Sequence, residues 1–359
     1  MTGEDFPQLQ STLQKIVAVS PDGIAAHQRH LDTLTKPIGS LGELETLAAR
    51  MVAALGKAPE LPLHKAVYVF AADHGIVAEG VSAYPQVVTE QMVLNFLRGG
   101  AAINVLCRAH NAELTVVDVG VCADFAPADG LLQRKVRQGS RNMLHEAAMS
   151  EAELQAAMSV GFEIADAAAS TAVTLLAAGE MGIGNTTSAS AITAMLTGRE
   201  VTAVTGKGTG LSTQGTAHKA AVIAACLERH GQSPSAKEPL EILRSLGGLE
   251  IAAIAGMILR AASLRIPILL DGFIVTAAAA VAVALEKNVR GYLIAGHCSE
   301  EPGHRSLLDF LELQPLISLN MRLGEGSGAA LAMPLVEAAL RLSAEMATFA
   351  SAGVSEAGA

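Results

Sequence analysis

The sequence predicts an α/β fold, in which a parallel sheet is covered by helices on both faces in a Rossmann-like arrangement. Short apolar runs suited to buried strands alternate with long helical stretches. Half of the residues are apolar, aromatic residues make up only 3%, and tryptophan is absent. This composition favours close-packed helices and buried parallel strands over β-sandwiches. The length of 359 residues suits one large domain, or a main domain with a smaller one.

The first 60 residues are predicted to be helical. Residues 40–43 (SLGE) match a capping box, and apolar residues follow at helical spacing from Leu44 to Leu55. The strands are predicted at residues 66–72, 113–118, 171–178, 266–270, 292–295 and 316–319.

Four of these strands end at or just before an acidic residue beside or near a glycine: Asp73, Asp118, Glu180 and Asp271. Ligands of open α/β sheets bind beyond the carboxyl ends of the strands. The sequence therefore predicts a polar cleft along this edge of the sheet.

Charge and hydropathy exclude several classes of protein. The formal charge of −10, with dispersed lysine and arginine, argues against binding of nucleic acid. The apolar run at residues 273–285 stops at Glu286 and is too short to span a bilayer, so we expect a buried helix. The N-terminus has no basic region and no apolar signal core, which predicts a cytoplasmic location. The four cysteines contain no C-x-x-C pair, so a disulfide framework or a structural zinc site is not expected.

Two glycine-rich loops are candidate phosphate sites. Residues 179–187 (GEMGIGNTT) follow a predicted strand and lead into a helix expected to begin near Thr187. Residues 205–210 (TGKGTG) form the second loop, and Lys219 lies just beyond it. Each loop alone is explained by a plain turn, but two loops flanking one helix favour a phosphate or phosphoribosyl cradle. Neither loop matches the motifs for nucleoside triphosphates or NAD.

The segment 322–330 (RLGEGSGAA) sets one carboxylate, Glu325, between glycines just before an apolar stretch. One interpretation is an ordinary acidic helix start, favoured by the helix dipole. The other is an acid/base group at a point where a small ligand closely approaches the chain.

Three further segments are ambiguous. Residues 297–304 (HCSEEPGH) match no standard metal spacing, so we predict a solvent-facing loop and no metal. Adjacent strand residues point to opposite faces, so we expect His74 to hydrogen-bond locally and shape the cleft rather than contact Asp73. Residues 80–93 place Tyr84 and Met92 where they suit a flat apolar ligand, although composition alone favours a turn and helix packed in the core. No magnesium-binding paired-acid motif is visible, and we expect no cofactor.

Seven segments together, in this order, resemble the nicotinate-nucleotide:dimethylbenzimidazole phosphoribosyltransferase family of the cobalamin pathway. They run from about residue 35 to residue 335, nearly the whole chain. The segments are 35–42 (TKPIGSLG), 71–75 (AADHG), 79–80 (EG), 117–120 (VDVG), 179–187, 271–273 (DGF) and 322–328.

The resemblance implies transfer of the 5-phosphoribosyl group from nicotinate mononucleotide to 5,6-dimethylbenzimidazole. The products would be α-ribazole 5′-phosphate and nicotinate, for the lower ligand of cobalamin. It also implies a homodimer, with a small helical domain from residues 1–60 and 335–359 and a large α/β domain from residues 61–334.

The resemblance assigns Glu325 as the general base, and Glu180 and Lys219 to the nucleotide side of the site. Tyr84 and Met92 fall in the base pocket, at positions that are polar in some relatives, so the preferred acceptor stays open. The full set of implied substrate-binding residues is Glu180, Gly182, Gly184, Asn185, Thr186, Lys219, Ser82, Tyr84, Gln91, Met92 and Leu323.

Two other functions stay open at this point. One is a nucleosidase or phosphorylase that sends the same ribosyl group to water or phosphate. The other is a catalytically silent nucleotide-binding protein.

Overall fold

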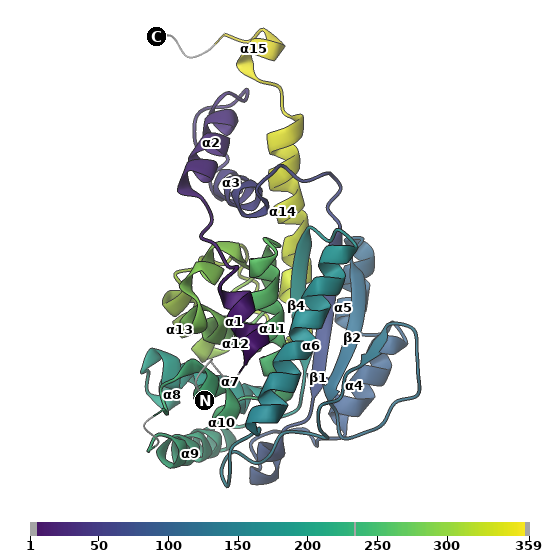
Figure 1. The fold of residues 1–359 in the computed structure, drawn as a ribbon, viewed down its shortest axis with the longest axis vertical. Helices are drawn as coiled ribbons and strands as arrows, with labels where there is room; N and C mark the ends of the chain where they lie inside the picture. Colours follow the sequence, from purple (N-terminus) through teal and green to yellow (C-terminus); the bar gives the residue numbers. More distant parts are fainter. Residues whose placement is uncertain (1–5, 233–234, 356–359) are drawn as a thin grey trace.

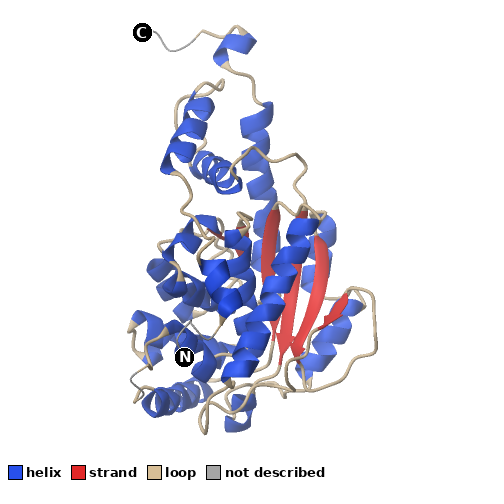
Figure 2. Cartoon of the chain, in the orientation of Figure 1, coloured by secondary structure: helices blue, strands red, loops and turns tan. Residues whose placement is uncertain are grey.

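The fold was analysed in a computed structural model that describes residues 6–232 and 235–355. Within these ranges, six strands form one parallel sheet in the order β3-β2-β1-β4-β5-β6 (Figures 1 and 2). The predicted α/β class is confirmed. The strands are β1 (Lys65–Ala72), β2 (Glu113–Gly120), β3 (Leu131–Gln133), β4 (Leu175–Met181), β5 (Ile268–Leu270) and β6 (Leu293–Ala295).

Three strand predictions need correction. The strand predicted at 171–178 begins four residues later, because Lys65 of β1 pairs with Leu175 and the preceding helix continues to Ser170. Glu180 therefore lies inside β4 rather than beyond it. Residues 316–319 form only an isolated bridge, between Ile317 and His297. The short strand β3 was missed.

Helices cover both faces of the sheet, and the side chains of β1 alternate between two apolar cores. Ala66 and Phe70 pack into a core shared with α6, α11 and α12. Val67 and Val69 face a second core with α3, α5 and α14. This alternation follows from the two-residue period of a strand. The helix at 273–285 is buried as predicted, and no helix in the described ranges has both the length and the apolarity needed to cross a membrane.

The helices connect these strands and frame the site. Their bounds are α1 (Pro7–Leu13), α2 (Pro21–Asp32), α3 (Glu43–Leu55), α4 (Val88–Leu97), α5 (Ala102–Ala109), α6 (Glu151–Ser170), α7 (Asn185–Thr197), α8 (Val201–Val204), α9 (Thr213–His230), α10 (Pro239–Leu246), α11 (Leu249–Ser263), α12 (Phe273–Leu285), α13 (Pro302–Leu311), α14 (Ser327–Glu345) and α15 (Phe349–Ala352), with short 3₁₀ helices η2 (Gly75–Glu79) and η3 (Lys287–Tyr292).

The helices predicted in the first 60 residues are present as α1, α2 and α3. Helices α2 and α3 pack beside the C-terminal half of α14, away from the sheet, whereas α1 lies against the main body (Figure 1). The expected capping box is wrong: α3 begins at Glu43 after Gly42, and no side chain caps it. Glu45, held by Lys36 at 2.8 Å, instead accepts a hydrogen bond from the Leu41 amide. The domain boundaries at residues 60 and 335 stay a prediction.

Candidate active site

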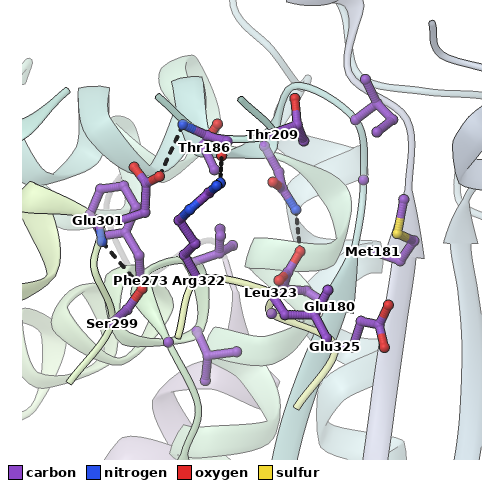
Figure 3. A pocket seen from close by; sticks show the side chains of 18 of the residues that line it. Glu180, Met181, Thr186, Thr209, Phe273, Ser299, Glu301, Arg322, Leu323 and Glu325 are labelled. Carbon is purple, nitrogen blue, oxygen red and sulfur yellow. Dashed lines mark hydrogen bonds between the residues drawn. The ribbon is translucent and has the colours of Figure 1, made fainter. Parts of the chain in front are cut away.

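A cavity of about 430 Å³ opens at the carboxyl ends of the strands, between the segments that follow β1 and β4. The strand order reverses between these two strands, which is where open α/β sheets bind ligands. Its lining comes from six segments of the chain, and Figure 3 shows residues from several of them converging. The lining residues are Tyr84, Val88, Met92, Glu180, Met181, Gly182, Ile183, Asn185, Thr186, Gly208, Thr209, Gly272, Phe273, Ile274, Val275, His297, Ser299, Glu301, Arg322, Leu323, Gly324 and Glu325.

Glu180 is a buried acid near the end of β4. Its Oε2 accepts a hydrogen bond from the Asn185 side chain at the start of α7. Burial raises the pKa of Glu180 to about 8; the negative charges of Asp271, Glu250 and Glu325 add to the increase, while Asn185 opposes it. At pH 7 the carboxyl therefore favours its protonated form.

Glu325 lies on a turn just before α14 and is 6% exposed. Burial raises the pKa of its carboxyl, the Ile103 backbone amide lowers it, and the charge of Asp271 raises it further. Its Oε2 atom is buried with no hydrogen-bond partner in the described part of the chain. A carboxyl with a raised pKa and a free oxygen in a cavity is suited to accept a proton.

The two glycine-rich loops meet at one wall of the cavity. Lys219 is fully buried and its Nζ donates to Thr186 Oγ1 at 2.7 Å. Burial lowers the pKa of Lys219 to about 8, although Glu301 partly opposes this shift. In the second loop, the Gly208 amide donates to Glu301 Oε1 at 2.9 Å, and Arg322 donates to the Gly208 carbonyl at 3.1 Å. The helix after the first loop begins at Asn185, two residues before the predicted start.

Part of the wall is apolar. Tyr84, Val88, Met92, Met181 and Leu323 line it, and Tyr84 and Leu323 are each more than half exposed. This wall is suited to the face of a flat ring. Figure 3 shows Met181 and Glu325 on one side of the cavity, with Ser299, Phe273 and Glu301 on the other.

Eight of the twelve residues singled out from the sequence line the cavity: Glu180, Gly182, Asn185, Thr186, Tyr84, Met92, Leu323 and Glu325. The other four lie near it without lining it. Gly184 is the left-handed N-cap of α7, Lys219 donates a hydrogen bond to Thr186, and Ser82 lies 3.4 Å from Thr209. Gln91 is exposed on α4.

The segment 297–304 was predicted wrongly as a solvent-facing loop. His297, Ser299 and Glu301 are buried and line the cavity, and His304 is fully buried against Thr276. The segment is buried because it follows β6 directly and turns into α13, which packs on α12. Three polar residue types directly after a strand were the signal that could have identified it.

The expected local bond of His74 is also wrong. Its Nε2 lies 2.6 Å from Glu250 Oε1, on α11 and 176 residues away. Its Nδ1 lies 3.2 Å from the Ser188 hydroxyl. The imidazole packs against Gly182 and Gly248 and does not line the cavity. Of the four acids predicted at strand ends, only Glu180 lines the cavity. Asp73 and Asp118 are buried, and each accepts a hydrogen bond from a backbone amide.

Comparisons with known proteins identify the family of the chain. A family model described as a phosphoribosyltransferase matches residues 16–354. A nicotinate-nucleotide–dimethylbenzimidazole phosphoribosyltransferase from Geobacter sulfurreducens is 50% identical over 348 residues, covering 97% of this chain and 98% of the relative. The chain belongs to this family.

Further relatives support the same placement. An enzyme of the same name from Chloroflexus aurantiacus is 49% identical over 348 residues, which cover 97% of this chain and 99% of the relative. The crystal structure of CobT from Thermus thermophilus matches with a TM-score of 0.89 and 49% identity, over 94% of this chain and all of the other.

Proposed function

We propose that this protein transfers the 5-phosphoribosyl group from nicotinate mononucleotide to 5,6-dimethylbenzimidazole. The products are α-ribazole 5′-phosphate and nicotinate, and the reaction serves the assembly of the cobalamin lower ligand. One observation carries the proposal. The chain is about 50% identical, over nearly its whole length, to enzymes named nicotinate-nucleotide–dimethylbenzimidazole phosphoribosyltransferase. In this chain, Glu325 and Glu180 both line the cavity where the strand order reverses.

The reaction needs no acid to expel the leaving group. The ring of nicotinate mononucleotide is a pyridinium, so breaking the C1′–N bond returns the electron pair to that nitrogen and leaves neutral pyridine. One benzimidazole nitrogen attacks C1′ from the opposite face and forms the new C–N bond, which converts a β-glycoside into an α-glycoside. The second nitrogen then loses its proton to the carboxylate of Glu325.

Glu180 has a different task in this proposal. The sugar develops positive charge as the bond breaks, and a nearby carboxylate stabilises that charge. The raised pKa of Glu180 is lowered when a cationic pyridinium binds beside it, since an opposite charge favours the ionised form. Binding of the nucleotide and ionisation of Glu180 therefore favour each other.

Positioning supplies the larger part of the rate. Holding two flat rings against one ribose can contribute about 7–11 kcal/mol of a bimolecular barrier, and a positioned base adds about 10²–10⁴-fold. Lys219 supports the nucleotide side through Thr186. We expect alanine at Glu180 or Lys219 to weaken nucleotide binding and to lower the rate; unchanged kinetics would refute that residue's role.

The deciding experiment is chromatographic analysis of products from nicotinate mononucleotide, with and without 5,6-dimethylbenzimidazole. Nicotinate and a phosphoribosylated base that form together, and only when the base is present, support the transferase. Nicotinate released equally without base identifies a hydrolase. Binding without turnover in either mixture leaves the silent nucleotide-binding protein.

We further propose a homodimer that acts in the cytoplasm, with the domain boundaries predicted above. The four cysteines are all unpaired, which suits a reducing compartment. Ile38, in the 35–42 motif, is 79% exposed, and such an apolar side chain suits a contact between subunits. Light scattering of the purified protein measures the mass: twice that of one chain supports the dimer, and a monomer refutes it.

A further inference from the structure

The proposed base sits on a turn with an unusual backbone. Gly324, Glu325 and Gly326 all have positive φ, at 81°, 64° and 89°. Glycine adopts this left-handed region freely, but a residue with a Cβ adopts it at a cost in energy. Glutamate therefore stays in this conformation only because its surroundings hold it there.

Asp271, which follows β5 directly, binds the backbone of this turn through its carboxylate. Its Oδ2 accepts a hydrogen bond from the Gly326 amide at 3.1 Å, and its Oδ1 accepts from the amides of Gly328 at 2.7 Å and Ala329 at 3.1 Å. The carboxyl is 1% exposed and does not line the cavity. Three backbone amides converging on one buried carboxylate fix the chain directly after Glu325.

His297 and Gly179 close the turn from two other sides. The Nε2 of His297 lies 3.7 Å from Asp271 Oδ1, and its ring packs against Gly328, where a Cβ would lie 1.9 Å from the ring. On β4, a Cβ on Gly179 would lie 2.3 Å from the carbonyl oxygen of Glu325. The backbone of Glu325 thus packs tightly between β4 and the segment that the Asp271 carboxylate binds.

We propose that Asp271 is a positioning residue for this reaction: without touching substrate, its carboxylate holds the turn left-handed so that Glu325 faces the acceptor ring. This inference rests on the proposed function, in which Glu325 removes a proton. The competing explanation is that Asp271 only caps α14 and stabilises the fold. The two explanations differ in whether loss of the carboxylate slows turnover beyond the effect of losing a buried acid.

The test compares Asp271→Asn with Asp118→Asn. Asp118 lies near the carboxyl end of β2 and is equally buried. It accepts a backbone hydrogen bond from Val121 at 2.9 Å, lies 3.4 Å from the Lys135 ammonium and does not line the cavity. In Asp271→Asn, an amide NH₂ replaces one acceptor oxygen and faces backbone N–H donors. We expect kcat to fall about 100-fold, the scale of a 1 Å misplacement, while the Kd for nicotinate mononucleotide, measured by calorimetry, changes less than about twofold. Asp118→Asn should retain wild-type kcat.

A second variant moves the turn without changing charge. Gly179→Ala pushes the Glu325 carbonyl, whereas Gly23→Ala, whose Cβ would have ordinary contacts of 3.4 Å or more, is its control. We expect Gly179→Ala to lower kcat and to leave the nucleotide Kd unchanged, even if Asp271→Asn fails to fold.

The pH profile of kcat/KM separates the two variants. The groups that face Glu325 are Asp271 after β5, Glu180 on β4 and the Ile103 amide on α5. Removing the Asp271 charge should move the acid limb to lower pH, and Gly179→Ala should not move it.

The outcomes are distinct from those of the proposed function. If wild-type protein makes no ribosylated base, the function itself is refuted. If wild-type protein is active and Glu325→Gln is not, but Asp271→Asn and Gly179→Ala both match their controls, only the positioning role is overturned. A nucleotide Kd that rises in step with the loss of kcat would also overturn it, because Asp271 would then act on the nucleotide cavity.

Discussion

The carboxylates at the two ends of the parallel strands have opposite environments. At the carboxyl edge, burial and neighbouring negative charges raise the pKa of Glu180 and of Glu325. At the opposite edge, Lys65 begins β1 and its Nζ lies 2.6 Å from the carboxyl of Glu337 on α14. Burial raises the pKa of Glu337, but hydrogen bonds from Lys65 and Arg341 outweigh it, so the net pKa is lowered.

The contrast separates an acid that stabilises the fold through an ion pair from acids that are available for catalysis. An ionised carboxylate without a cation is costly to bury, so a chain selected only for stability would pair it or replace it. Among the described residues, no cation is a main cause of the pKa shift of Glu180 or Glu325. Perturbed acids gathered in a cavity are the pattern expected of a functional site.

The largest expected effect comes from substituting the base. Glu325→Gln should lower kcat about 10²–10⁴-fold, because the amide cannot accept the benzimidazole proton. The Kd for nicotinate mononucleotide should stay near that of wild type, since Glu325 faces the acceptor side. Steady-state kinetics and calorimetry measure the two quantities.

The matched control is Glu337→Gln at the other edge, which should leave kcat unchanged. Near-normal turnover of Glu325→Gln would remove that residue from the proposed role. A loss of turnover in the control would show that replacing an acid far from the cavity also impairs catalysis, so the effect of Glu325→Gln would not indicate a specific role.

Breaking the ion pair at the opposite edge should affect stability instead. Lys65→Met should lower the free energy of unfolding by about 3 kcal/mol, the lower end for a broken buried pair, because Arg341 still contacts Glu337 at 3.1 Å. Urea denaturation measures this change, and kcat at 25 °C should match wild type. A variant as stable as wild type would mean that the ion pair between Lys65 and Glu337 contributes no more to the free energy of unfolding than an exposed pair does.

The sequence predicted the features that are local. Apolar runs located five of the strands, because a buried parallel strand reads as continuous hydrophobic sequence. The glycines around Glu325 and the loop at 179–187 were recognisable, since a left-handed turn at Gly184 and Gly324 demands that residue type. Eight of the twelve singled-out residues line the cavity for the same reason: their motifs are short and continuous.

What sequence reasoning missed depends on contacts between distant segments. Whether His297 is buried depends on β6 packing against the start of α14, and no periodicity near residue 297 reports this. The bond of His74 to Glu250 joins residues 176 positions apart. The register of β4 is set by pairing with β1, so its start at Leu175 could not be read from the apolar run alone.

A separate expected effect is a pH dependence of stability that has opposite sign at the two ends of the strands. The folded pKa of Glu180 is about 8, against an unfolded value of about 4.3. An acid with a raised pKa contributes stability that is fully present below the unfolded value and is lost as pH rises through the folded value. Glutamine does not titrate, so the stability of Glu180→Gln relative to wild type should rise with pH, by at most about 1.4 kcal/mol per pH unit between about pH 5 and 8.

Glu337 should behave in the reverse way. Its lowered pKa contributes stability that is present above the unfolded value of about 4.3 and is lost as pH falls through the folded value. The stability deficit of Glu337→Gln should therefore be constant above about pH 5 and shrink below it. Urea denaturation at pH 4, 6, 7 and 8 gives both curves. A flat difference for Glu180→Gln from pH 6 to 8 would mean that Glu180 is already ionised without nucleotide, and nucleotide binding would then not be linked to its ionisation.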